Sequence, residues 1–171
     1  MKMSKTFKLQ FKRREEGRTD YRNRLRLLRS PNPRLVVRKS LNYITAQVIS
    51  FTPKGDKTII SATSKELKKL GWTFSTDNIP AAYLTGMLIA KKCKEKNIPT
   101  ANLDAGLYAS TKGNRVYALV KGAVDAGLDV PVSKEIFPSD DRISGKHISS
   151  YLEKFKSLPE TFESVKGKIG G

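Results

Sequence analysis

The hydrophobic pattern of the first half of the chain predicts three β-strands. Residues 43–50 alternate between apolar and polar side chains, as is typical of a strand with one buried face. Two further apolar segments, 34–38 and 58–62, lie on either side of it. The connections are short and polar, and the second contains Pro, Gly and Asp, which favour turns. We therefore predict a three-stranded antiparallel meander.

Apolar residues at helical spacing predict two core helices further along the chain. A short helix at 64–70 precedes them, and a fourth strand at 98–104 lies between them. We expect this strand to be parallel to a neighbour, because a helix crosses over to it. The buried stripes are Tyr83, Leu84, Met87, Leu88 and Ala90 in the first core helix, and Val116, Leu119, Val120, Ala123 and Val124 in the second. The order βββαβα predicts an α/β (α+β) fold, in which helices pack against a mixed, mainly antiparallel sheet.

Both ends of the chain are more polar than this centre. Residues 1–29 form a basic arm with a predicted helix at 19–28, and the following Ser-Pro-Asn-Pro segment breaks any helix. In the tail, Ile148, Tyr151, Leu152 and Phe155 are spaced as on one face of an amphipathic helix, and we expect the last six residues to be flexible. The predicted division is thus an extended arm at 1–29, a globular core at 30–132 and a helical tail at 133–171.

Charge narrows the class of partner. The net charge is +17, and 14 of the first 40 residues are Lys or Arg against three acids. Neutralising the phosphates of a nucleic acid releases condensed counterions, so such an arm gains binding energy mainly against RNA or DNA. A membrane is the weaker alternative, because no segment approaches the ~20 apolar residues of a spanning helix. The single Cys and the absence of an apolar leader pattern in the first ten residues lead us to expect a cytoplasmic protein.

The sequence offers little for catalysis. Cys93 lies among lysines that would lower its pKa, yet the single histidine, His147, is remote in sequence. One Cys and one His cannot form a zinc site, and Asp140-Asp141 precedes an apolar residue as at a helix start. Asp104 ends a predicted strand, where carboxylates often act in catalysis, but no companions stand at comparable positions. We expect no cofactor and no metal. The loop 109–114 lacks the pattern of a nucleotide-binding loop and remains a candidate for an RNA phosphate contact.

The polar segment 38–43 carries a second signal for RNA. It joins two predicted strands and presents two cations, a hydroxyl, an amide and an aromatic ring within six residues. Arg and Lys bind phosphate, Asn and Ser bind 2′-hydroxyls or base edges, and Tyr stacks on an unpaired base. An ordinary polar hairpin with Tyr43 packed locally is an equally acceptable interpretation of the residues alone.

Matched blocks between residues 17 and 148 closely resemble the archaeal branch of large-subunit ribosomal protein eighteen, the family that binds 5S ribosomal RNA. Its eukaryotic relatives are called ribosomal protein five. The blocks are Gly17-Arg18-Thr19-Asp20-Tyr21, Arg24 to Ser30, Pro33 to Ser40, Asn42 to Ile49, Gly127 to Pro131, Phe137-Pro138-Ser139 and Arg142 to Ile148. Leu41 departs from this pattern, because a more polar residue is expected there.

The resemblance implies a structural, non-enzymatic role in the large ribosomal subunit. The implied partners are 5S rRNA, the large-subunit rRNA and neighbouring large-subunit proteins. The implied arm contacts are Lys12, Arg13, Arg14, Arg18, Tyr21, Arg22, Arg24, Arg26 and Arg29. The implied hairpin contacts are Arg38, Lys39, Ser40, Asn42 and Tyr43, while Lys146 and His147 match a later block. Two alternatives are a metal-dependent nuclease on a similar sheet and a protein that coats nucleic acid without specificity.

Overall fold

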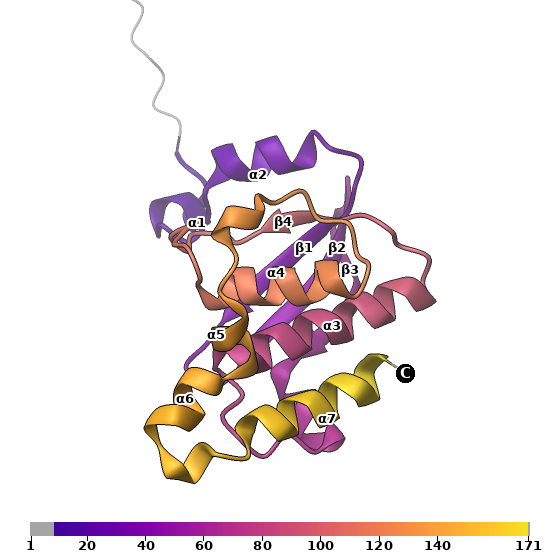
Figure 1. Ribbon diagram of the computed structural model, residues 1–171. Coiled ribbons are helices and arrows are strands. Elements are labelled where there is room, and N and C mark those ends of the chain that lie inside the picture. The colour runs from indigo at the N-terminus through magenta and orange to yellow at the C-terminus, as the bar shows by residue number, and fades with distance from the viewer. Residues whose placement is uncertain (1–8, 171) are drawn as a thin grey trace, which may run out of the picture.

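A computed structural model describes residues 9–170 and shows a four-stranded sheet with the strand order β3-β2-β1-β4 (Figure 1). The antiparallel strands are β1 (Arg34–Lys39), β2 (Ile44–Thr52) and β3 (Gly55–Thr63), and β4 (Asn102–Asp104) runs parallel to β1. The predicted α+β class, meander and parallel fourth strand are confirmed. The fourth strand begins later than expected, because Ala101 donates its N–H to the carbonyl of Asp129 instead of extending β4.

One face of the sheet carries the main core. Leu35 and Val37 of β1 are fully buried on this face. They pack beneath α3 (Ile79–Glu95) and α4 (Arg115–Asp125), the two predicted core helices, which lie across the same face (Figure 1). These helices approach so closely that a Cβ at Gly86 would lie 1.9 Å from the carbonyl oxygen of Leu119. Glycine is therefore required at this crossing.

Both core helices begin at an asparagine that caps them. Asn78 caps α3, and its side-chain oxygen accepts the N–H of Ala81 at 2.9 Å. Asn114 caps α4 in the same way through the N–H of Tyr117, at 3.0 Å. The short predicted helix is the 3₁₀ helix η1 (Ser64–Leu70), which ends at Gly71 with φ 101°. Such caps satisfy amides that have no acceptor within the helix.

The tail consists of short helices followed by one longer helix. The elements are η2 (Lys134–Ile136), α5 (Asp140–Ser144), α6 (Lys146–Tyr151), η3 (Glu153–Phe155) and α7 (Leu158–Gly170). The predicted amphipathic helix through residues 148–155 is wrong, because Leu152 is extended and Tyr151 is 85% exposed. The expected flexible end is also wrong for residues 166–170. They belong to α7, which buries Leu158, Phe162, Val165 and Ile169 in a second apolar cluster with residues of α3 and η1.

The arm contains two helices, α1 (Lys12–Glu15) and α2 (Tyr21–Leu28), and the second confirms the helix predicted at 19–28. Asp20 caps α2 by accepting the N–H groups of Arg22 and Asn23. Residues 1–8 lie outside the described part of the chain. Within residues 9–170, no helix is both long and apolar enough to cross a bilayer.

Candidate nucleic-acid interface

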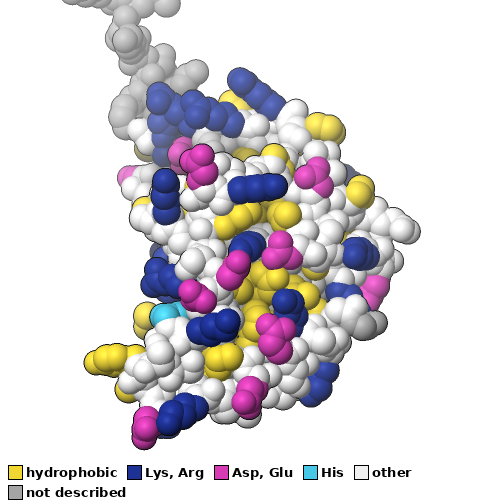
Figure 2. All heavy atoms as spheres, in the orientation of Figure 1, with side chains coloured by type: hydrophobic (Ala, Val, Ile, Leu, Met, Phe, Trp, Pro, Cys, Tyr) yellow, Lys and Arg dark blue, Asp and Glu magenta, His cyan; other side chains and the backbone are white. Residues whose placement is uncertain are grey.

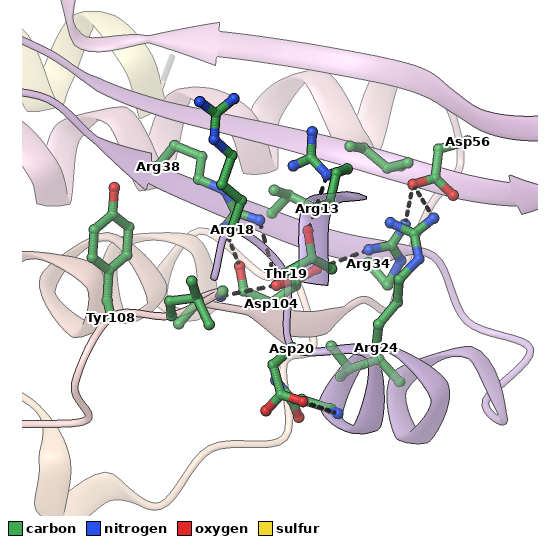
Figure 3. A pocket seen from close by; sticks show the side chains of 17 residues that line it. Arg13, Arg18, Thr19, Asp20, Arg24, Arg34, Arg38, Asp56, Asp104 and Tyr108 are labelled. Atoms are coloured by element: carbon green, nitrogen blue, oxygen red, sulfur yellow. Dashed lines mark hydrogen bonds and ion pairs between the residues drawn. The ribbon is translucent and has the colours of Figure 1, made fainter. Parts of the chain in front are cut away.

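The arm and the sheet enclose a polar hollow of about 360 Å³, which we call the arm–sheet cleft (Figure 3). On the sheet side it is lined by Arg34, Val36 and Arg38 of β1. Successive side chains of a strand point to opposite faces, so these residues lie on the face opposite Leu35 and Val37. The arm therefore covers the sheet face that α3 and α4 leave open.

Arg34 is the centre of the cleft and is only 4% exposed. Its Nη1 donates to Oδ2 of Asp104 at 2.8 Å, and its Nη2 donates to Oδ2 of Asp56, also at 2.8 Å. Asp104 ends β4, and Asp56 lies in β3. One buried guanidinium thus joins three strands of the sheet, and the two carboxylates compensate its charge.

Asp56 also holds the arm. Its Oδ2 accepts a second hydrogen bond, from Nη2 of Arg24 in α2, at 2.8 Å. Leu27, one helical turn later, lines the same cleft. The inward face of α2 is therefore held to the sheet by the Arg24–Asp56 ion pair, with Leu27 turned toward the cleft. The other cations of α2 and its C-terminal end, Arg22, Arg26 and Arg29, are exposed and lie on the opposite side of the helix.

Four arm arginines are exposed and have no side-chain hydrogen bond or ion pair with any residue in 9–170; they are Arg14, Arg22, Arg26 and Arg29. The last three are spaced i, i+4 and i+7, so they form a row on the outward side of α2 and its C-terminal end. Figure 2 shows Lys and Arg side chains gathered at this end of the molecule. The row presents positive charge to solvent, and no acid among the described residues neutralises it.

The remaining predicted arm residues have local partners. Arg13 Nε donates to the hydroxyl of Thr19 at 3.0 Å, and Arg18 Nε lies 3.0 Å from Oε2 of Glu16. Lys12 is 4.0 Å from the same carboxylate, with its side chain 88% exposed. The ring of Tyr21 packs on Phe11, with centroids 5.2 Å apart. These contacts shape the arm, while the exposed cations among them stay accessible to a polyanion.

At the edge of the cleft, Arg38 lies over Gly106. Its Nη1 donates to the carbonyl of Asp104 at 3.1 Å, and its Nη2 lies 3.6 Å from the carboxylate of that residue. A Cβ at Gly106, where φ is +64°, would lie 3.0 Å from the guanidinium. Nearly half of the Arg38 side chain remains exposed. Arg38 is thus placed at the opening of the cleft with part of its charge free.

Tyr108 fastens the neighbouring end of β1. Its hydroxyl donates to the carbonyl of Lys39 at 2.8 Å and accepts the N–H of the same residue at 3.2 Å. The Lys39 ammonium lies 4.9 Å from the centroid of the Tyr108 ring. A cation above an aromatic face is held electrostatically, so Tyr108 fixes both the backbone and the side chain of Lys39.

Of the predicted hairpin residues, some stabilise the turn and others have side chains accessible to a ligand. Ser40 builds the turn: its hydroxyl donates to the carbonyl of Tyr43 and accepts the N–H groups of Asn42 and Tyr43. The Asn42 side chain is exposed, and the half-buried Tyr43 ring has the Lys65 ammonium 6.0 Å from its centroid. Leu41, at the tip, is 93% exposed. Asn42 and Tyr43 are therefore the members of the hairpin best placed for an RNA contact.

Lys146 and His147 lie apart from the arm, at the start of α6, and both are exposed. His147 nevertheless lines the same cavity as Lys39, together with the N-terminal ends of α3 and α4. We call this hollow of about 410 Å³ the helix-end cavity. The structure thus brings together two predicted residues that are far apart in the sequence.

The candidate catalytic groups are engaged in other ways. Burial raises the pKa of the Cys93 thiol to about 11, opposite to the effect expected from the nearby lysines. Asp104 is bound to Arg34 and also accepts the N–H of Gly106 at 2.9 Å. Asp140 pairs with Lys121, whose hydrogen bond and charge lower the pKa of the carboxyl. Within residues 9–170, no group of three or more His, Cys, Asp or Glu is arranged to hold a metal ion.

Arg34, Asp56 and Tyr108 are the site residues that the sequence analysis missed. Arg34 begins an apolar strand and Asp56 occupies a turn-like segment, so neither position indicated a buried ion pair. The one available signal was Asp104, an isolated acid at a strand end. A charge at such a position requires a partner, but the sequence did not indicate which cation supplies it.

Sequence comparison with known proteins identifies the family of the chain. A sequence model of the family described as ribosomal large subunit proteins 60S L5, and 50S L18 matches residues 5–98 and 92–133. The large ribosomal subunit protein uL18 of Korarchaeum cryptofilum (strain OPF8) is 51% identical over 156 residues, which cover 91% of this chain and 80% of that protein. The chain belongs to this L5/L18 family.

Membership confirms the predicted resemblance and the non-enzymatic role. Proteins of the L5/L18 family are structural components of the large ribosomal subunit, so this chain is a structural ribosomal protein and not an enzyme. Its location is the cytoplasmic ribosome, and its partners are rRNA and ribosomal proteins. A nuclease on the same sheet is thereby excluded.

Proposed function

We propose that the chain binds 5S rRNA and helps to attach it to the large-subunit rRNA. Residues 1–29 act as the RNA-binding arm, and the β1–β2 hairpin supplies local contacts. The observation that carries the proposal is the outward row of arginines on α2, which faces away from the ion pairs of the arm–sheet cleft. The choice of 5S rRNA among ribosomal RNAs follows from the sequence resemblance.

The arm gains affinity by neutralising phosphates. Arg22, Arg26 and Arg29 point outward from one helix whose inner face is fixed by Arg24 and Asp56. Their positions are set before RNA arrives, which lowers the ordering cost of binding. Lys12, Arg13, Arg14 and Arg18 extend the same positive surface along the arm, and Tyr21 supports it by packing on Phe11. Each phosphate contact releases counterions, so the affinity depends strongly on salt.

The hairpin contributes recognition rather than bulk charge. Ser40 fixes the turn, which presents Asn42 to solvent. An exposed amide binds 2′-hydroxyls or base edges, and the partly exposed ring of Tyr43 offers a stacking surface. Arg38, with nearly half of its side chain exposed at the opening of the cleft, binds an adjoining phosphate.

A charge-neutralising variant tests the role of the arm. In Arg14→Gln/Arg22→Gln/Arg26→Gln/Arg29→Gln, four exposed cations are lost, while glutamine keeps a high helix propensity. We expect the slope of log K against log salt for 5S rRNA to become shallower by about 3 to 4, close to one per lost phosphate contact. Substitution is preferred to deletion of the arm, because Val36 is only 5% exposed beneath it.

The matched control removes the same charge elsewhere. Lys68→Gln/Lys69→Gln/Lys94→Gln/Lys154→Gln neutralises four exposed lysines that have no ion pair within residues 9–170. They lie on η1, at the end of α3 and in the tail. The control should keep the wild-type salt slope to within about one unit. Equal losses in the two variants would show that the arm has no special role.

A further inference from the structure

The helix-end cavity holds four basic side chains from four separate elements. Lys39 comes from the end of β1, Arg115 from the first turn of α4, Arg142 from α5 and His147 from α6. Their convergence is not a consequence of local sequence, because Lys39 and His147 are far apart along the chain and meet only in the folded structure. Several cations brought into one hollow repel one another unless an anion binds between them.

Carboxylates neutralise only part of this charge. Arg115 is paired with Asp77, since its Nη1 forms an ion pair with that carboxylate and donates to the Asp77 carbonyl at 2.9 Å. Lys39 lies over the Tyr108 ring, and the His147 ring faces a backbone carbonyl, that of Asp141, at 3.2 Å. Within residues 9–170, neither Lys39 nor Arg142 forms a salt bridge. The cavity therefore keeps uncompensated positive charge.

The N-termini of two helices add positive electrostatic potential to the helix-end cavity. Asn78 and Asn114, the caps of α3 and α4, both line the cavity. Each cap satisfies the N–H of its helix's third residue. The second residue of α3 is Pro80, which has no N–H, so the other first-turn amides are those of Ile79 in α3 and of Arg115 and Val116 in α4. The positive ends of both helix dipoles accordingly act on the same hollow as the four side chains.

The cavity adjoins the arm–sheet cleft. Tyr108 lines the cleft, and the Lys39 ammonium on its ring lines the cavity. Figure 3 shows Tyr108 at the end of the cleft beyond Arg38, and in Figure 2 further blue side chains lie near the single His (cyan). A polyanion that leaves the cleft past Arg38 therefore meets cations again on the other side of Tyr108.

We infer that the helix-end cavity is a second RNA site, which binds a backbone phosphate of the same RNA that the arm holds. This inference rests on the proposed function, because it takes the RNA on the arm as its starting point. Lys39 and Arg142 supply the positive charge that binds the phosphate. Arg115, which is paired with Asp77 at the start of α4, lines the same cavity. The site fixes the RNA at a position remote from α2, and so defines its direction across the protein.

The test is phosphate-ethylation interference on 5S rRNA with the variant Lys39→Gln/Arg142→Gln. We expect the wild-type chain to show two groups of interfering phosphates, and the variant to lose one group while keeping the group that depends on the arm. The salt slope should become shallower by about 1 to 2. Lys68→Gln/Lys94→Gln, which removes two exposed lysines elsewhere, is the matched control. Thermal unfolding of each variant checks that the fold is kept.

The measurements distinguish failure of this inference from failure of the proposed function. If wild type binds 5S rRNA and the variant shows the same interference and slope, the cavity is not an RNA site and the proposed function stands. If wild type does not bind 5S rRNA specifically, both proposals fail. A third arm titrates inorganic phosphate without RNA: stabilisation of wild type but not of the variant, combined with unchanged RNA binding, would make the cavity a free-anion site and overturn the inference.

Discussion

The arm–sheet cleft and the helix-end cavity are both lined by cations, but they differ in how many of these cations pair with a carboxylate. In the cleft, each cation pairs with a carboxylate: Arg24 with Asp56, Arg38 with Asp104, and Arg34 with both. Arg34 is almost completely buried. In the cavity, Asp77 pairs with Arg115, while Lys39 and Arg142 have no carboxylate partner among residues 9–170. The same residue types therefore serve two purposes: compensated cations hold the arm on the sheet, and uncompensated ones remain for an external anion.

We expect the largest effect on stability from a substitution at Asp104. In Asp104→Ala, Arg34 keeps Asp56 but loses its other buried partner, and we expect the free energy of unfolding to fall by about 3 kcal/mol. The value lies at the lower end for a broken buried pair because Asp56 still faces the guanidinium. Urea denaturation measures the loss. A variant as stable as wild type would mean that the cleft network is not structural.

Asp56 tests whether the cleft positions the arm. Asp56→Asn removes a negative charge, so attraction to any nucleic acid should rise slightly. We nevertheless expect 5S rRNA affinity to fall about threefold to tenfold, because α2 loses its anchor at Arg24 and must be ordered on binding. Parallel titrations with 5S rRNA and with a DNA duplex of equal length separate the two effects. Tighter binding to both ligands would show that the arm acts through charge alone.

The smallest effect is expected for an exposed pair outside both regions. Asp140 pairs with Lys121, but its own side chain is 92% exposed, so Asp140→Ala should cost less than about 1 kcal/mol in urea denaturation. A loss as large as that of Asp104→Ala would remove the distinction between buried and exposed pairs on which the comparison depends.

The sequence predicted those features that depend on neighbouring residues. The strands, α3 and α4 follow from period-two and helical spacing. In the tail, the spacing of Ile148 to Phe155 was misleading, since extended Leu152 ends α6 and a later apolar row, from Leu158 to Ile169, packs on the core instead. A period alone does not show which of two apolar faces finds a partner.

The site was predictable as a set of residue types but not as an arrangement. The basic arm and hairpin were visible from charge and from the resemblance. The ion pairs of Arg34 with Asp56 and Asp104, however, span 22 and 70 residues. Their formation depends on β3 and β4 lying on opposite sides of the β2–β1 pair, which is a property of the sheet order. The meeting of Lys39 with His147 likewise depends on how α5 packs against α3 and so positions α6.

The most direct test of the account is a binding titration with 5S rRNA at about 0.2 M salt, in the presence of excess transfer RNA. At this salt concentration nonspecific charge pairing is already weakened, so any remaining affinity reports the shape and position of the contacts. We predict tight binding that survives the competitor. Binding that the competitor abolishes would contradict it, because the arm and the cavity would then recognise charge without recognising 5S rRNA.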